Sequence, residues 1–187
     1  MKERRGRRIF SAVAVFLAAM VLQRACTLAW GRAPGPDGGR FELSVVGLSR
    51  IAGGAPGVRT DCRWWPTYGD PTLCRARTGG MVAFRAMRFA YPMLQIALWL
   101  AVASLLLQAL RVPRQRLVQA AIPATACALT IASVACMVRG ARDGLAAFDG
   151  ISVSFGAAGF VSAVVAAVLS LVSALLVLES FSAVDDA

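Results

Sequence analysis

The residues best suited to chemistry in this chain are two cysteines, Cys62 and Cys74, which bracket the stretch CRWWPTYGDPTLC. Two neighbouring thiols either form a structural disulfide or exchange electrons with a substrate. Exchange enzymes usually carry a close CxxC pair, which lowers a thiol pKa, and the sequence contains no CxxC. We interpret Cys62 and Cys74 as a structural pair. A membrane thiol-disulfide oxidoreductase that uses them, with Cys26 as relay, is the alternative.

Other catalytic groups are scarce. The chain has no histidine, and so lacks the commonest metal ligand and the most frequent general base. Asp37, Glu42, Asp61 and Asp70 are scattered among arginines in one segment, a pattern typical of solvated charges. We therefore expect no catalytic site, no metal and no cofactor.

Composition places the chain in a membrane. Hydrophobic residues make up 58% and charged residues 16%, whereas soluble domains carry about 25% charged residues. A spanning helix needs about 20 mostly apolar residues, and the segments 9–30, 89–110, 117–138 and 151–178 satisfy this. We predict an all-α membrane protein in which residues 1–187 form one four-helix bundle.

The net charge of +10 indicates membrane topology here, and not nucleic-acid binding, because the basic residues flank the helices. The N-terminal MKERRGRR and the basic turn 111–116 are expected on the cytoplasmic side, as the positive-inside rule requires. Both termini are then cytoplasmic, in a plasma or bacterial inner membrane. Residues 31–88 are then expected on the extracytoplasmic side. The arginines in this loop do not contradict that location, since loops near 60 residues largely escape the positive-inside rule.

The start of the chain has a second interpretation. Arg24 interrupts the first apolar run, and the shorter charge-free stretch before it has the length of a signal peptide. Removal of residues 1–29 is therefore an open alternative. We favour a retained helix, because the apolar run resumes after Arg24 and this side chain can snorkel to the interface.

Small residues recur along the last two helices and predict their packing faces, since close approach of helices in lipid needs small side chains. Chance recurrence in alanine-rich helices is the alternative. The partner face would belong to another helix or to a second copy of the protein. The residues are Ala158, Ser162, Ala166 and Ser170 on the fourth helix, and Ala124 and Ala128 on the third.

The outer loop predicts a small antiparallel β-sheet. Residues 32–40 are rich in Gly and Pro and are expected to form a turn. Residues 41–51 alternate apolar and polar side chains and then slip in phase, which predicts a strand with a bulge. The segment VRTDCRWW predicts a second strand. In an oxidising space, a Cys62–Cys74 disulfide would stabilise so small a sheet; Cys26, Cys127 and Cys136 are expected to be free thiols.

Aromatic and basic residues between the two loop cysteines form a candidate interaction surface. Trp and Arg dominate interface hot spots, so Arg63, Trp64, Trp65 and Tyr68 would contact a partner protein or lipid headgroups. Alternatively, one Trp packs on the disulfide and the sheet, while its neighbour faces outward because successive strand residues point to opposite faces.

Together these features resemble the claudin and peripheral myelin protein superfamily. They are the four helices, Trp30 at the root of a long first outer loop, the strand pair, Cys62 with Cys74, and the outer-helix motif MVAFRAMRFA with Arg85 and Arg88. The resemblance implies a four-helix bundle under a small sheet and a role in contacts between membrane proteins, through lipid-embedded partners or self-association. The Gly-Leu-Trp run that precedes the first claudin cysteine is absent, so paracellular sealing is not implied.

We expect Cys62 and Cys74 to be joined stoichiometrically in protein purified from membranes, with Cys26, Cys127 and Cys136 reduced. Native alkylation followed by non-reducing peptide mass spectrometry measures this. A partly reduced Cys62–Cys74 pair, or one exchanged with Cys26, would favour the oxidoreductase alternative.

Overall fold

The computed structural model describes residues 2–34, 39–51, 60–63, 87–110, 116–145 and 154–185. Within these residues it contains four long helices, each long and apolar enough to cross a membrane, as predicted. They are α1 (Lys2–Thr27), α3 (Met87–Ala109), α4 (Arg116–Leu145) and α5 (Ala158–Asp185).

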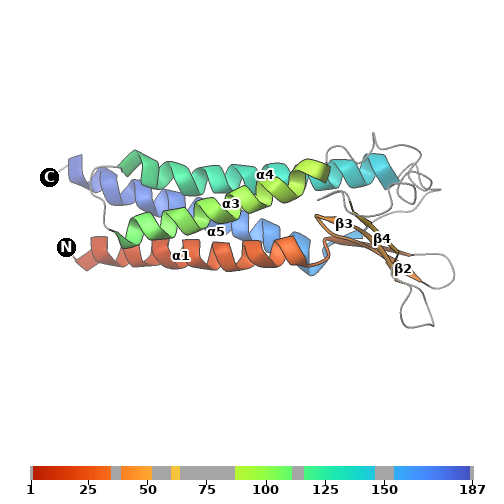
Figure 1. Cartoon of the computed structure of the whole chain (residues 1–187). Helices are drawn as coiled ribbons and strands as arrows, with labels where there is room; N and C mark the ends of the chain where they lie inside the picture. The colour runs from red at the N-terminus through yellow and green to blue at the C-terminus, as the bar shows by residue number, and fades with distance from the viewer. Residues whose placement is uncertain are drawn as a thin grey trace.

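The helices form a closed bundle in which each one has two principal neighbours. α1 packs against α5 and α3, and α4 packs against α3 and α5. The four lie side by side, with both chain termini at one end and the β-strands at the other (Figure 1). The bundle therefore has a terminal end and a sheet end.

Small residues and hydroxyl groups fill the interior of the bundle. Ala18, Ala97 and Ala163 are fully buried, which lets the helix backbones approach one another. Ser11 Oγ of α1 lies 2.9 Å from Ser173 Oγ of α5, and Ser133 Oγ of α4 donates to the Ala90 carbonyl of α3 at 2.9 Å. Large apolar side chains lie on the outside, among them Phe10, Phe16, Trp99 and Val168. This distribution suits a bundle surrounded by lipid.

The predicted small-residue stripes only partly coincide with the buried faces. Ala166 and Ser170 are buried and Ser162 is half-buried, whereas Ala158 is exposed. Ala124 and Ala128 are exposed too, and α4 instead buries Ala126, Thr130, Ser133 and Met137. The reason is geometric. A helix has 3.6 residues per turn, so a strict four-residue spacing drifts by about 40° per step and leaves the contact face.

Two helices begin elsewhere than predicted. α1 starts at Lys2 and not at 9, so the basic N-terminal segment is already helical. α5 starts at Ala158 and not at 151, because Ser154–Phe155 forms strand β5. Gly156 separates the two elements with a φ of 136°, a backbone conformation that side-chain-bearing residues rarely adopt.

The sheet has five antiparallel strands in the order β4-β3-β2-β1-β5. The fifth, β5, lies outside the loop 31–88 that was predicted to supply the sheet. The strands are β1 (Gly31–Pro34), β2 (Arg40–Leu43), β3 (Gly47–Ile51), β4 (Thr60–Arg63) and β5 (Ser154–Phe155).

Of two local predictions for the loop, one was confirmed in part and one was wrong. The turn predicted for 32–40 is shorter than expected, because Gly31–Pro34 forms β1, which pairs antiparallel with β2 from Arg40 onward. Residues 41–51 form two strands and not one bulged strand. The phase slip marks a tight turn, in which Ser44 N donates to the Gly47 carbonyl at 2.9 Å and Gly47 N donates to Ser44 Oγ at 3.2 Å. The Ser44 hydroxyl thus supplies the turn with a side-chain acceptor.

Gly140 provides a test of the α3–α4 contact. A Cβ at this position would lie 2.5 Å from Met87 Cγ, so Gly140→Ala is expected to lower the melting temperature in detergent. Overpacking costs about 1–3 kcal/mol, more than the roughly 1 kcal/mol gained in helix propensity. In a Met87→Ala background the same substitution should no longer destabilise; equal losses in both backgrounds would contradict this contact.

Candidate functional site

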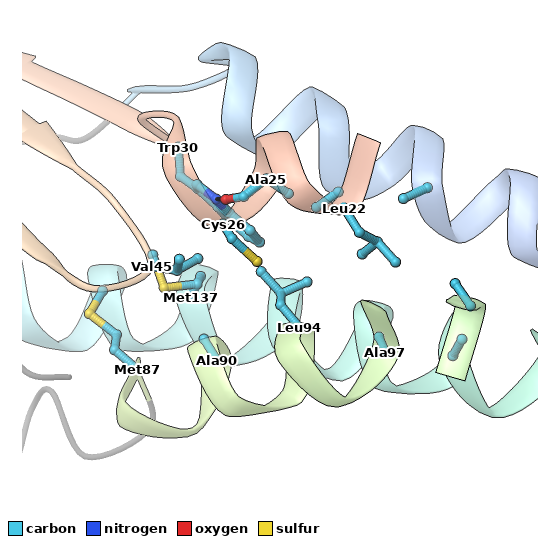
Figure 2. Close-up of a cluster of buried hydrophobic side chains, with 14 of the residues drawn as sticks. Leu22, Ala25, Cys26, Trp30, Val45, Met87, Ala90, Leu94, Ala97 and Met137 are labelled. Atoms are coloured by element: carbon cyan, nitrogen blue, oxygen red, sulfur yellow. Dashed lines mark hydrogen bonds between the residues drawn. The ribbon is translucent and has the colours of Figure 1, made fainter. Parts of the chain in front are cut away.

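Trp30 is the residue at which the sheet joins the bundle. It lies between α1 and β1 and is fully buried. Its indole Nε1 donates to the Ala25 carbonyl of α1 at 2.7 Å, and its backbone N donates to the Leu43 carbonyl of β2 at 2.6 Å. Figure 2 shows the indole nitrogen directed at the Ala25 oxygen. One residue thus bonds to both layers.

The first turn of α5 completes this junction. Gly159 N donates to the Ala29 carbonyl at 2.8 Å, and a Cβ on Gly159 would lie 2.5 Å from Trp30 Cδ1 and 2.6 Å from the Leu28 carbonyl oxygen. Phe160 meets the Trp30 ring edge to face, with the centroids 6.2 Å apart, a favoured aromatic geometry. Only glycine allows α5 to approach the end of α1 so closely.

Side chains from the remaining elements pack beneath Trp30. Leu43 and Val45 come from β2 and the turn after it, Met87 from α3 and Met137 from α4, and all four are buried. Figure 2 shows the strand and helix residues meeting around one cluster. The sheet is therefore held in one orientation by contacts with all four helices.

The register divides the sheet into an apolar and a polar face. Phe155 pairs with Gly31, Gly31 with Leu43, and Leu43 with Leu48. Residues directly opposite each other share a face. Gly31 and Leu43 are buried, and the Phe155 ring lies 5.6 Å from the Phe160 ring of α5. This face covers the sheet end of the bundle.

The opposite face carries a polar row across the strands, which we name the polar sheet face. Ser154, Arg32, Glu42 and Ser49 are successive register partners, and Asp61 occupies the next position on β4. Glu42 Oε1 lies 3.5 Å from both Arg32 Nε and Arg40 Nη2. These residues were not predicted as functional. The sequence signal that could have identified these residues is the alternation of polar and apolar side chains in RFEL and in GRAP.

The polar sheet face suits recognition better than reaction. One carboxylate shared between two guanidinium groups leaves one excess positive charge, and Glu42 retains only 20% side-chain exposure. Among the described residues, no group of three His, Cys, Asp or Glu side chains could hold a metal ion. The arrangement offers directional, charge-assisted hydrogen bonds on a rigid support.

The predicted interaction residues fall largely outside the described ranges. The residues outside the described ranges are Trp64, Trp65, Tyr68, Cys74 and Arg85. The proposed disulfide therefore also lies outside the described residues. Within β4, Cys62 pairs with Leu48 and Arg63 pairs with Gly47. Arg88 lies half-buried at the start of α3.

The other three cysteines are free: Cys26 and Cys127 are buried and Cys136 is half-buried. Cys26 lies one turn below Trp30 and its thiol is hydrogen-bonded to the Gln95 side chain.

No protein-family model and no curated protein sequence matches this chain. Its function is therefore inferred from its residues and their geometry.

Gly159→Ala tests the junction. The added methyl group would meet two backbone carbonyls as well as Trp30, and backbone cannot move aside as a flexible side chain can. We expect a loss of about 1–3 kcal/mol, as for other overpacked cores, seen as a lower melting temperature by tryptophan fluorescence in detergent. Gly6→Ala is the matched control, since apart from its chain neighbours and the backbone of its own helix no atom lies within 4 Å of a Cβ at this position. Equal melting temperatures of the two variants would contradict the close approach at Gly159.

Proposed function

We propose that this protein is a non-enzymatic integral membrane protein that acts in assembly, in adhesion or as an auxiliary subunit, through the β-rich region at one end of its helix bundle. The observation that carries the proposal is the sheet itself. One face is anchored on the bundle through Trp30 and Leu43, and the other presents the polar sheet face. A surface built in this way is preorganised for a partner.

Preorganisation matters energetically because binding costs the entropy of every side chain that must be ordered. In the polar sheet face, Glu42 already pairs with Arg32 and Arg40 at 3.5 Å, and strand pairing fixes the backbone that carries all three residues. Complementary charges on a partner would then set orientation and specificity more than raw affinity. A further membrane protein, or a second copy of this chain, is the partner class that fits a surface so close to the membrane.

The membrane orientation is part of the proposal. The short segments at the terminal end of the bundle are basic: Arg7 and Arg8 lie in the first turns of α1, and Arg111, Arg114 and Arg116 lie at the short connection between α3 and α4. The positive-inside rule then supports cytoplasmic termini and an extracytoplasmic sheet, in a plasma or bacterial inner membrane. Claudin-like ancestry is proposed on the sequence features alone, namely Trp30, Cys62, Cys74 and Arg85. An extracytoplasmic Cys62–Cys74 disulfide would stabilise the sheet in addition to its contacts with Trp30.

The oxidoreductase alternative draws less support. A relay from Cys62 would need a thiol within reach, and Cys26 is only 6% exposed beneath Trp30. Reactive cysteines usually lie in partly exposed, electropositive surroundings. We therefore keep recognition as the proposed function.

Photo-crosslinking in the native membrane tests it. A crosslinking amino acid at Arg32 or Ser49, on the polar sheet face, is expected to give a discrete protein adduct, whereas one at Val168, on the lipid-facing side of α5, should give mainly lipid adducts. Glu42→Lys should reduce the Ser49 adduct several-fold, because it reverses the negative charge that pairs with both Arg32 and Arg40. Glu179→Lys is the matched control at the terminal end. Absence of protein adducts from both sheet positions would refute the proposal.

A further inference from the structure

The outward side of α1 changes from apolar to polar near the sheet end. Gln23, Arg24 and Thr27 are exposed there, and among the described residues the Arg24 guanidinium has no ion-pair partner. At about 100° per residue these side chains share an arc of roughly 120° with exposed apolar side chains nearer the start of the helix. The apolar ones are Val13, Phe16, Leu17 and Met20. We name the whole set the outward stripe of α1.

The contact with α5 shows how deep Arg24 lies. Gly159 N donates to the Ala29 carbonyl, and Arg24 lies five residues before Ala29, which is more than one helical turn. Val161 of α5 lies only two residues beyond Gly159 and is exposed. Arg24 is therefore further from the sheet than an outward-facing apolar residue of the neighbouring helix.

The contact with α3 gives the same result. The Cys26 thiol is hydrogen-bonded to the Gln95 side chain, so these two residues lie at similar height. Phe89 precedes Gln95 by six residues, toward the sheet, and is 60% exposed. At about 1.5 Å per residue, Phe89 lies roughly 9 Å nearer the sheet than Gln95. The apolar surface of α3 thus continues well past the level of Arg24.

The length of α1 agrees with this depth. The exposed apolar side chains of α1 begin at Ile9, after the exposed Arg8. A membrane span takes about 20 residues, so the hydrocarbon would reach to roughly residue 28. Gln23 and Arg24 then lie inside the apolar band of the bundle, and not at its edge.

A lipid headgroup is a poor partner for Arg24 in this position. Side chains on a helix tilt toward its N-terminus, and the N-terminus of α1 lies at the end of the bundle opposite the sheet (Figure 1). The Arg24 side chain therefore leaves α1 directed away from the sheet-side headgroups, and it must bend back to snorkel. Charged side chains within a membrane usually pair with an opposite charge. A carboxylate at the same depth would meet this need.

A second copy of this chain does not supply that carboxylate. Within the four described spans, Glu179 is the only acidic residue; it is the last residue of its span and pairs with Arg7 at the terminal end. A copy in the same orientation would place Glu179 at the opposite side of the membrane from Arg24. Charge complementarity therefore requires a different protein.

We propose that the outward stripe of α1 docks a transmembrane helix of another membrane protein, which carries an Asp or Glu more than one turn below the sheet-side edge of its apolar segment. The carboxylate would accept charge-assisted hydrogen bonds from Arg24, with the Gln23 amide as a further donor. Phe16 and Met20 would pack along the same helix. This identifies a partner class for the proposed assembly function and rests on its membrane placement, but not on the polar sheet face.

The test uses a defined probe, a synthetic membrane-spanning helix of leucine and alanine with one aspartate at the depth of Arg24. Binding to the full-length chain is measured by Förster transfer in phosphatidylcholine liposomes at mildly alkaline pH. We expect binding about ten-fold tighter than for the same peptide with asparagine in place of aspartate. Arg24→Gln should make the two peptides bind alike. Arg8→Gln, which removes an exposed arginine at the other end of α1, is the matched control and should keep the preference.

A charge reversal guards against a merely structural effect of the substitution. Arg24→Glu should prefer a peptide with lysine at the same depth over the aspartate peptide, because the pair is then restored with opposite signs. The melting temperatures of Arg24→Gln and Arg24→Glu, measured by tryptophan fluorescence, should stay close to that of the wild type, since Arg24 is exposed.

Three results would overturn the inference. Equal binding of the aspartate and asparagine peptides to the wild type would show that Arg24 does not select a carboxylate. Loss of the preference when phosphatidylglycerol replaces half of the phosphatidylcholine would assign Arg24 to a lipid phosphate. Förster transfer between two copies of the chain that Arg24→Gln abolishes would assign the stripe to self-association. None of these results alters the crosslinks expected from Arg32 and Ser49, so failure here is distinguishable from failure of the proposed function.

Discussion

The buried hydrogen bond from the Trp30 indole to the Ala25 carbonyl is the interaction on which the arrangement of sheet and bundle depends. A short sheet cannot bury enough apolar surface to be stable alone. Trp30 joins this sheet to a larger core. Its large apolar ring is buried among the helices, and its backbone N donates to the Leu43 carbonyl of the sheet. The close contact at Gly159 brings α5 to the same point, so the sheet and the helix ends share one core.

The helices obey a different constraint, because lipid supplies no hydrophobic force between them. Their cohesion comes from close backbone approach at buried alanines and from hydroxyl bonds, such as Ser11 to Ser173 and Ser133 to the Ala90 carbonyl. At the terminal end, the exposed Arg7–Glu179 pair at 3.3 Å contributes little, as surface pairs generally do. The bundle is thus held together mainly by packing along its length.

These two constraints leave two distinct surfaces available for binding, the outer surface of the helices and the polar sheet face. The outward-facing side chains of all four helices include large apolar residues, such as Phe16, Trp99, Ile131 and Leu171. Beyond the helix ends, the sheet presents the row around Glu42, in which Arg32 and Arg40 are exposed. Lipid or a transmembrane helix would meet the first surface and a protein segment outside the membrane the second. Both are rigid because the elements that carry them meet in the cluster beneath Trp30.

The sequence alone determined the number and approximate limits of the membrane helices, the presence of a small sheet and the free state of three cysteines. Hydropathy and charge are local properties, and twenty apolar residues have few options besides a spanning helix. Tertiary structure alone decided that residues 31–34 form a strand and that Ser154–Phe155, which is distant in sequence, joins the same sheet. It also decided which face of α4 is buried. These features depend on partners distant in sequence, since strand pairing needs a neighbour and a buried helix face needs another helix. Neither partner is encoded in the local pattern.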